Sequence, residues 1–326
     1  MGEVAERRER LCTCGHVVRW APTGPTALDE VDCERCGQTH LFSWFVKMDV
    51  GLSEICNLHC NMCRRPPDPQ FLETDAVIRA MHDAASIGLT TVSFCGGEPF
   101  VHKDFLDICE VCFDLGLKVQ LVTNGMRCTP AAMKRLRPVD CITFSHDGML
   151  ENHNRIRGND QSFQKANKAL VMALDEGISA GTNTVIQRSN VQDILPLFEH
   201  LVDLTDGRLS YIRFVPVEVT PSTADLMPTP EQLFDIRAQL KAVARRCEEL
   251  DIFFCHKKQI IDYLPLYLDK FKRNRPLGGC HIPQRFIGYT DLGYYLCWHQ
   301  GHSIKAPSLI DALRTPEARR VVDEAM

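Results

Sequence analysis

The stretch VKMDVGLSEICNLHCNMC, residues 46–63, joins an apolar run typical of a buried strand to three closely spaced cysteines. A helical pattern follows, with Thr74 as its expected N-cap and Gly88 just past its end. Strand-like and helix-like stretches then alternate as far as residue 217. The further expected strands are TTVSF (90–94), KVQLVT (118–123), CITFS (141–145), TNTVIQ (182–187) and YIRFVPV (211–217).

This alternation predicts a parallel sheet with right-handed crossovers. Six units are too few for a closed eight-stranded barrel, so we expect an α/β fold built on a partial (β/α)6 TIM-like barrel. Chemically active residues should then lie at the C-terminal ends of the strands. Beyond the barrel, Thr229 and Gln232 predict the capping box of another helix. The expected parts are a small Cys-rich knuckle (1–45), the barrel core (46–225) and a C-terminal extension (226–326).

The charge balance excludes some classes of partner. The 326 residues carry 37 Lys and Arg against 42 Asp and Glu, a formal net charge of −5. This balance, without long blocks of one sign, argues against nucleic acid and anionic membranes as partners. No run reaches the roughly 18 apolar residues that a transmembrane helix needs. The charged start MGEVAERRER also lacks the apolar stretch of a signal peptide. We therefore expect a cytoplasmic protein.

The chain has sixteen cysteines, several of them in clusters. In a reducing cytosol such clusters indicate metal or iron–sulfur ligation more often than disulfides. Near the N-terminus, a CxC and a CxxC are formed by Cys12, Cys14, Cys33 and Cys36. Four thiolates from two tight turns are typical of a structural zinc knuckle. An iron–sulfur cluster and a metal-free segment are the alternatives.

A second cluster, CxxxCxxC, directly follows the first expected strand and consists of Cys56, Cys60 and Cys63. Three thiolates on one loop can hold three irons of a 4Fe–4S cube and leave the fourth iron open to a ligand. A zinc turn completed by His59 and a set of plain core cysteines are the alternatives.

Polar turns follow the next three expected strands. They are Cys95-Gly96-Gly97-Glu98-Pro99, Thr123-Asn124-Gly125 and Ser145-His146-Asp147-Gly148. The two adjacent glycines permit a close backbone approach to a ligand, and the glutamate adds an acceptor beside them. Each turn taken singly is ordinary turn chemistry.

Together and in this order, the cysteine motif, GGEP, TNG and SxDG resemble the core of the radical SAM superfamily. An RxRG downstream, with Arg155, Arg157 and Gly158, adds to the resemblance, which covers roughly residues 46–217. Met62 departs from the pattern, because many members carry an aromatic residue before the last cysteine. This departure removes no ligand.

The resemblance implies that Cys56, Cys60 and Cys63 hold a 4Fe–4S cluster whose open iron is chelated by S-adenosylmethionine. It implies that an electron, from a reductant such as flavodoxin or ferredoxin, cleaves this cofactor to methionine and a 5′-deoxyadenosyl radical. That radical would take a hydrogen atom from the substrate.

The same resemblance implies which residues contact the cofactor. It places Gly96, Gly97 and Glu98 near the methionine amino group, and Asn124 and Ser145 near the ribose and carboxylate.

The C-terminal part resembles the twitch or SPASM extension of the same superfamily, which binds an auxiliary iron–sulfur cluster. Cys280 and Cys297, with Gly293 before the second cysteine, match its opening. No cysteine follows them, so Cys255 is the expected third ligand. Its expected substitutes are Cys247, His281, His299 and His302. Plain hydrophobic cysteines are the alternative.

These patterns predict a radical SAM enzyme that modifies a natural product by epimerisation, dehydrogenation or bond formation. A sugar-like small molecule is the favoured substrate, and Asn183, Gln187 and Arg213 are candidates to face it. A maturase of a ribosomally made peptide is the first alternative. A non-enzymatic iron–sulfur or zinc protein for binding or electron transfer is the second.

Overall fold

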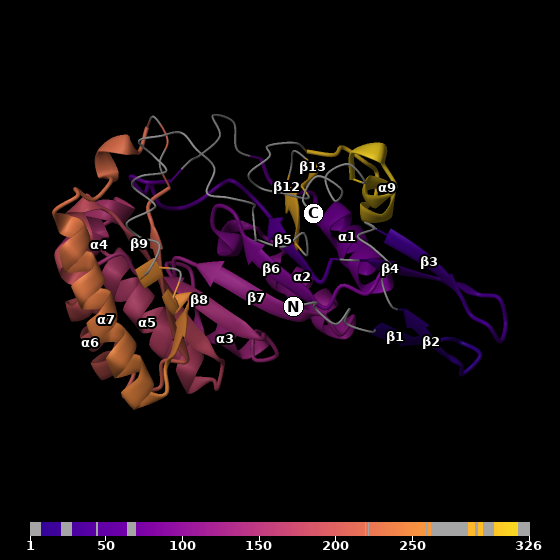
Figure 1. Cartoon of the computed structure of the whole chain (residues 1–326), viewed down its shortest axis with the longest axis horizontal. Coiled ribbons are helices and arrows are strands. Elements are labelled where there is room, and N and C mark those ends of the chain that lie inside the picture. The colour runs from indigo at the N-terminus through magenta and orange to yellow at the C-terminus, as the bar shows by residue number, and fades with distance from the viewer. Residues whose placement is uncertain are drawn as a thin grey trace.

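The computed structural model describes residues 8–20, 28–43, 45–63, 70–218, 220, 222–258, 260–261, 286–290, 293–295 and 303–318. Within these residues, nine strands form one sheet in the order β11-β10-β9-β8-β7-β6-β5-β12-β13 (Figure 1). Their bounds are β5 (Lys47–Gly51), β6 (Thr91–Cys95), β7 (Lys118–Thr123), β8 (Cys141–Ser145), β9 (Ala180–Ile186), β10 (Tyr211–Pro216), β11 (Phe253–Cys255), β12 (Phe286–Thr290) and β13 (Gly293–Tyr295).

Strands β5 to β10 are neighbours in chain order and all run parallel, which confirms the expected α/β sheet of six units. Two additions lie at its edges. β11 extends the sheet beyond β10 in parallel, and β12 pairs in parallel with β5 on the other side. β13 returns antiparallel to β12, so the Gly/Tyr-rich hairpin of the C-terminal part is a component of the main sheet.

Helices follow the strands and cover one face of the sheet. They are α1 (Thr74–Ser86), α2 (Phe105–Asp114), α3 (Pro130–Arg135), α4 (Leu150–Arg157), α5 (Ser162–Asp175), α6 (Ile194–Leu204), α7 (Gln232–Leu250) and α9 (Leu309–Leu313), with 3-10 turns η1 (Pro99–Val101), η2 (Arg188–Asp193) and η3 (Ala224–Leu226). Thr74 is the first helical residue rather than the N-cap, which is Glu73, because its hydroxyl donates to Asp104 instead. Thr229 and Gln232 do exchange the hydrogen bonds of a capping box, although regular helix begins only at Gln232.

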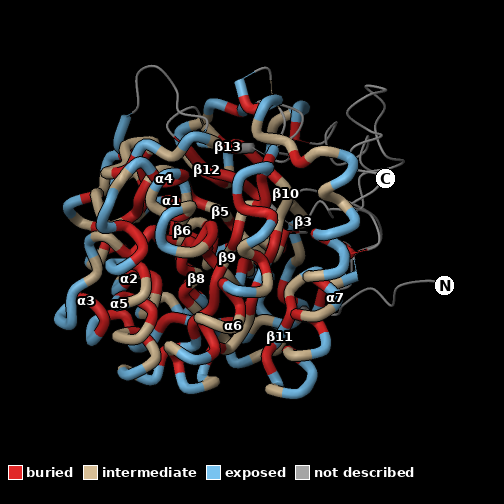
Figure 2. The backbone as a smooth tube through the Cα atoms, turned by 90° about the vertical axis from the view of Figure 1, so that its left-hand side faces the viewer, coloured by how far each residue is buried: buried red, intermediate tan, exposed pale blue. Residues whose placement is uncertain are grey.

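The two faces of the sheet differ in polarity. Phe94, Phe144 and Phe214 point toward the helices and are almost fully buried in the main core. The strand register places polar side chains on the opposite face, which we call the inner face. Figure 2 shows the strands buried at the centre and exposed residues on the outer helices.

The N-terminal segment folds as two antiparallel hairpins that extend beyond the main sheet, near α1 and α9 (Figure 1). Their strands are β1 (Arg8–Leu11), β2 (Val17–Trp20), β3 (Leu28–Asp32) and β4 (Thr39–Ser43). This confirms a small N-terminal unit, while the domain boundaries at residues 45 and 225 stay predictions. Among the helices described, none combines the length and apolar character that crossing a membrane requires.

Candidate active site

The cysteine loop leaves the C-terminal end of β5 and carries Cys56, Cys60 and Cys63. The first two thiols are half-buried and the third is exposed. Cys60 accepts a backbone hydrogen bond from Cys63 at 3.2 Å, so the last two cysteines sit in one tight turn. The three thiols do not form the kind of tight group, within 4.8 Å, that a single ion needs. A 4Fe–4S cube needs no such tight group, because it binds each thiolate to a different iron.

The GGEP turn at the end of β6 packs directly on this loop. Gly97 N–H donates to Ser53 O at 2.6 Å and Glu98 N–H to Ile55 O at 3.0 Å. A Cβ on Gly97 would lie 2.2 Å from Ile55 O, and one on Gly96, whose φ is +96°, would lie 2.8 Å from Ser53 O. The glycines do permit a close approach, as expected, and the backbone they approach is that of the cysteine loop.

Glu98 connects this turn to the next strand end. Only 1% of the residue is exposed. Its carboxylate accepts hydrogen bonds from Thr123 Oγ1 and Asn124 N, both at 2.7 Å, and from Phe100 N at 3.3 Å. Burial raises the pKa of Glu98, and these three donors oppose the shift. The acceptor seen in the sequence therefore positions the TNG turn beside the cysteine loop, and its predicted place near the methionine amino group stays a prediction.

Asn124 reaches the cysteine loop itself. Its Nδ2 donates to Asn57 Oδ1 at 2.8 Å and to Cys56 Sγ at 3.7 Å. Its Oδ1 accepts from Met126 N at 2.9 Å, which fixes the orientation of the amide. Ser145, at the end of β8, is 9% exposed and lies on the inner face in register with Asn183. Their proposed contacts with ribose and carboxylate stay predictions.

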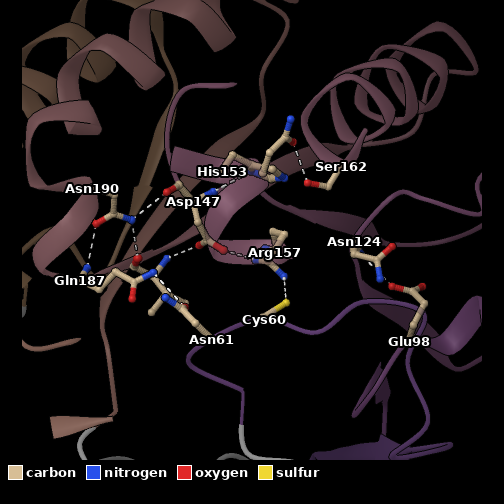
Figure 3. A network of polar contacts seen from close by, with 12 residues as sticks. Cys60, Asn61, Glu98, Asn124, Asp147, His153, Arg157, Ser162, Gln187 and Asn190 are labelled. Carbon is tan, nitrogen blue, oxygen red and sulfur yellow. Dashed lines mark hydrogen bonds and ion pairs between the residues drawn. The ribbon is translucent and has the colours of Figure 1, made fainter. Parts of the chain in front are cut away.

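The SxDG and RxRG motifs meet at Arg157, the last residue of α4 (Figure 3). Its guanidinium forms an ion pair with Asp147 at 2.5 Å and donates to Cys60 Sγ at 3.7 Å. Asp147 is fully buried, and its other oxygen accepts from Val185 N at 2.8 Å. Burial raises the pKa of Asp147 and the guanidinium opposes that shift. Arg157 therefore ties β8 and β9 to the second cysteine.

The neighbours of Arg157 also hold the loop. Ile156 O accepts from Asn61 N at 2.9 Å. A Cβ on Gly158, whose φ is +65°, would lie 2.9 Å from His59 O. The sequence identified the RxRG only as part of a family pattern and assigned it no role. Arg157 and Cys60 are 97 residues apart in the sequence, and local sequence patterns do not encode a contact over that distance.

Two of the three candidate substrate residues lie on the inner face. Asn183 and Arg213 are in register with Ser145, and Arg213 is exposed. Gln187 instead turns to the cysteine loop, where its Nε2 donates to Asn61 Oδ1 at 3.3 Å. Within the described residues, Asn183 Oδ1 and Gln187 Oε1 are buried without a hydrogen-bond partner. An unsatisfied acceptor beside the loop and another on the inner face fit a bound ligand that donates hydrogen bonds.

The remaining sequence candidates divide into two groups. Cys12, Cys14, Cys33 and Cys36 come together, with all four sulfurs within 4.8 Å of one another. Cys255 lies at the end of β11 and is half-buried. Cys280 and Cys297, like His281, His299 and His302, lie outside the described residues, so the auxiliary cluster stays a prediction.

Comparisons with known proteins agree with this arrangement. The profile of the Radical SAM superfamily matches residues 50–201. Fe-coproporphyrin III synthase of Methanosarcina barkeri is 30% identical over 171 residues, 51% of this chain and 43% of that protein. PqqA peptide cyclase of Granulibacter bethesdensis is 26% identical over 263 residues, 78% of this chain and 67% of that protein.

The fold is also shared with a solved structure. Streptococcus suis SuiB bound to precursor peptide SuiA superposes with a TM-score of 0.63 at 15% identity, covering 87% of this chain and 65% of SuiB. Such low identity shows the fold alone. The chain spans about half the length of the first curated relatives it matches. The profile match, together with the four joined motifs, shows a radical SAM domain over residues 50–201 of this chain.

Proposed function

We propose that this protein uses a 4Fe–4S cluster on Cys56, Cys60 and Cys63, together with S-adenosylmethionine, to start a radical reaction on a peptide. The observation that carries the radical chemistry is the joining of four motifs. The ends of β6 and β7 and the last turn of α4 bond directly to the single loop that bears the three thiols, and the end of β8 is tied to it through the ion pair of Asp147 with Arg157.

The residues present fit the cluster and its cofactor. Asn124 and Arg157 donate to two of the thiol sulfurs, which partly offsets the negative charge of bound thiolates. Gln187 offers a buried acceptor beside the loop, and Asn183 offers another on the inner face. When bound, the reduced cluster and S-adenosylmethionine would supply a radical able to abstract a hydrogen atom. The protein's own residues hold the loop rigid and present the inner face to the substrate.

A peptide substrate is favoured by the extent of the relatives' matches. The match to PqqA peptide cyclase runs over 263 residues, well beyond the superfamily domain, whereas that to Fe-coproporphyrin III synthase runs over 171. SuiB, whose fold this chain shares, was solved with a precursor peptide. These matches favour a peptide over the sugar-like substrate that the sequence analysis preferred. We therefore prefer the peptide maturase, with flavodoxin or ferredoxin as the proposed reductant.

Turnover of a precursor peptide tests this proposal. The anaerobically reconstituted, reduced protein is incubated with S-adenosylmethionine and a short peptide encoded beside its gene, and the peptide mass is measured. We expect a peptide of changed mass, or of changed hydrogen isotope content in D2O, with the wild type and not with Cys60→Ala. Modification of a sugar-like compound, with every such peptide left unchanged, would overturn the peptide assignment.

A further inference from the structure

The two N-terminal hairpins carry a thiol site that the proposed radical chemistry does not use. Cys12 and Cys14 lie in the turn between β1 and β2, and Cys33 and Cys36 lie in the turn between β3 and β4. The sulfurs of Cys12 and Cys36 are 3.5 Å apart and those of Cys14 and Cys33 are 3.6 Å apart. Each close pair therefore joins one hairpin to the other.

These distances distinguish one ion from a cluster. A Zn–S distance of about 2.3 Å and tetrahedral angles place the sulfurs of a zinc site about 3.8 Å apart. All four sulfurs here lie within 4.8 Å of one another. An iron–sulfur cluster distributes its thiolates over several irons and sets them farther apart. The separations also exceed the roughly 2.05 Å of a disulfide bond.

Backbone hydrogen bonds close both turns that carry the thiols. Cys12 N–H donates to His16 O and Gly15 N–H to Cys12 O, both at 2.8 Å. In the second turn, Cys33 N–H donates to Gln38 O and Gly37 N–H to Cys33 O, also at 2.8 Å. Each turn therefore fixes the backbone on which its two cysteines lie.

The hairpins have too little core to be stable on their own. Among the residues described there, their separate buried cluster consists of five side chains, of which two are the cysteines just described: Cys12, Val18, Trp20, Cys33 and Phe42. Trp20 and Phe42 stack at 5.7 Å. A unit of this size ordinarily needs a metal or a disulfide to fold.

We infer that Cys12, Cys14, Cys33 and Cys36 bind one structural Zn²⁺, which joins the two hairpins into a zinc ribbon. The ribbon is fastened to the radical SAM domain and to the C-terminal part. Ser43 N donates to Ile87 O at 2.8 Å just after α1, and Arg314, just after α9, forms an ion pair with Glu30 at 2.7 Å. Because the ribbon enters β5 at its start and the cysteine loop leaves β5 at its end, the zinc is separate from the proposed cluster.

Metal analysis of four proteins tests this inference, whether or not S-adenosylmethionine is cleaved. The wild type, Cys14→Ser, Cys36→Ser and Cys60→Ala are purified anaerobically from zinc-containing medium, and zinc and iron per chain are measured. We expect about one zinc per chain in the wild type and Cys60→Ala, and less than half of that in both ribbon variants. After reconstitution of the 4Fe–4S cluster, only Cys60→Ala should contain less iron per chain than the wild type.

Cobalt replacement provides a readout of geometry. Co²⁺ bound to the wild type should give the strong visible absorption of a tetrahedral thiolate site, and Cys36→Ser should weaken it. Zinc that is independent of the ribbon cysteines would overturn the inference. Iron lost in place of zinc, or ribbon cysteines recovered as disulfides, would overturn it equally.

Discussion

Arg157 is a buried cation whose partners come from distant parts of the chain, Asp147 at the end of β8 and Cys60 on the cysteine loop. Replacing it with glutamine would leave the fully buried Asp147 without its counter-charge. Loss of one partner from such a pair typically costs about 3–5 kcal/mol. We expect Arg157→Gln to lower the free energy of unfolding by roughly that amount in anaerobic denaturant titrations.

The matched control is Arg155→Gln, two residues earlier on the same helix. Arg155 is exposed and contacts Asn152, so its loss should change stability by no more than about 0.5 kcal/mol. An equal decrease in the free energy of unfolding in the two variants would show that the buried ion pair does not stabilise the fold more than an exposed contact does.

His146 predicts a pH dependence of stability. Burial lowers the pKa of His146 to about 4, and its Nε2 contacts Asn167 at 3.0 Å. In unfolded chains histidine has a pKa of about 6.5, so between pH 6.5 and 4 the unfolded state binds a proton that the folded state does not. Stability must therefore fall as pH drops through this window.

The measurement is the free energy of unfolding at pH 7.5 and pH 5.5. In His146→Gln the glutamine does not titrate, so the loss of stability at the lower pH should be about 1 kcal/mol smaller than in the wild type. In the folded wild type His153, whose pKa burial lowers to about 2, stays neutral at both pH values. The same loss in both proteins would contradict the assignment.

At the scale of the elements, the GGEP turn has no space for an added side chain at Gly97. A Cβ on Gly97 would meet the backbone of residues 54 and 55 at 2.2–2.8 Å, and backbone atoms cannot move aside as a flexible side chain can. We expect Gly97→Ala to displace the cysteine loop and to reduce the iron retained after cluster reconstitution several-fold.

Gly116→Ala is the control for this turn. Gly116 follows α2 with a φ of +71° and has open space around it. Alanine there should cost only about 1–2 kcal/mol for the left-handed conformation, and iron content should stay at the wild-type level. Comparable iron loss in both variants would show that general destabilisation, rather than displacement of the loop, removes the cluster.

Across the whole molecule, the parts that sequence could predict are those with local causes. The βα order follows from apolar periodicity within each stretch, and the site motifs lie at strand ends because parallel strands end at one edge. β11 has only three residues and gives little periodicity. The pairing of β12 with β5 joins residues more than 230 positions apart, which local pattern does not specify.

The candidate site shows the same division. The three thiols and the glycine turn were identified from their positions after expected strands and from the resemblance of the ordered motifs to the radical SAM core. The roles of Arg157 and Glu98 were missed, because each acts through a partner distant in sequence. The inner-face positions of Asn183 and Arg213 depend on strand register, in which a shift of one residue reverses the side chain. Gln187, just beyond β9, faces the cysteine loop instead.

The most direct test of the central claim is the amount of 5′-deoxyadenosine formed from S-adenosylmethionine. It is measured in the anaerobically reconstituted, dithionite-reduced protein with a candidate precursor peptide present, beside Cys60→Ala. We predict its formation by the wild type and none above background by the variant. Its absence from a wild type that carries full iron, or equal formation by Cys60→Ala, would contradict radical chemistry at this loop.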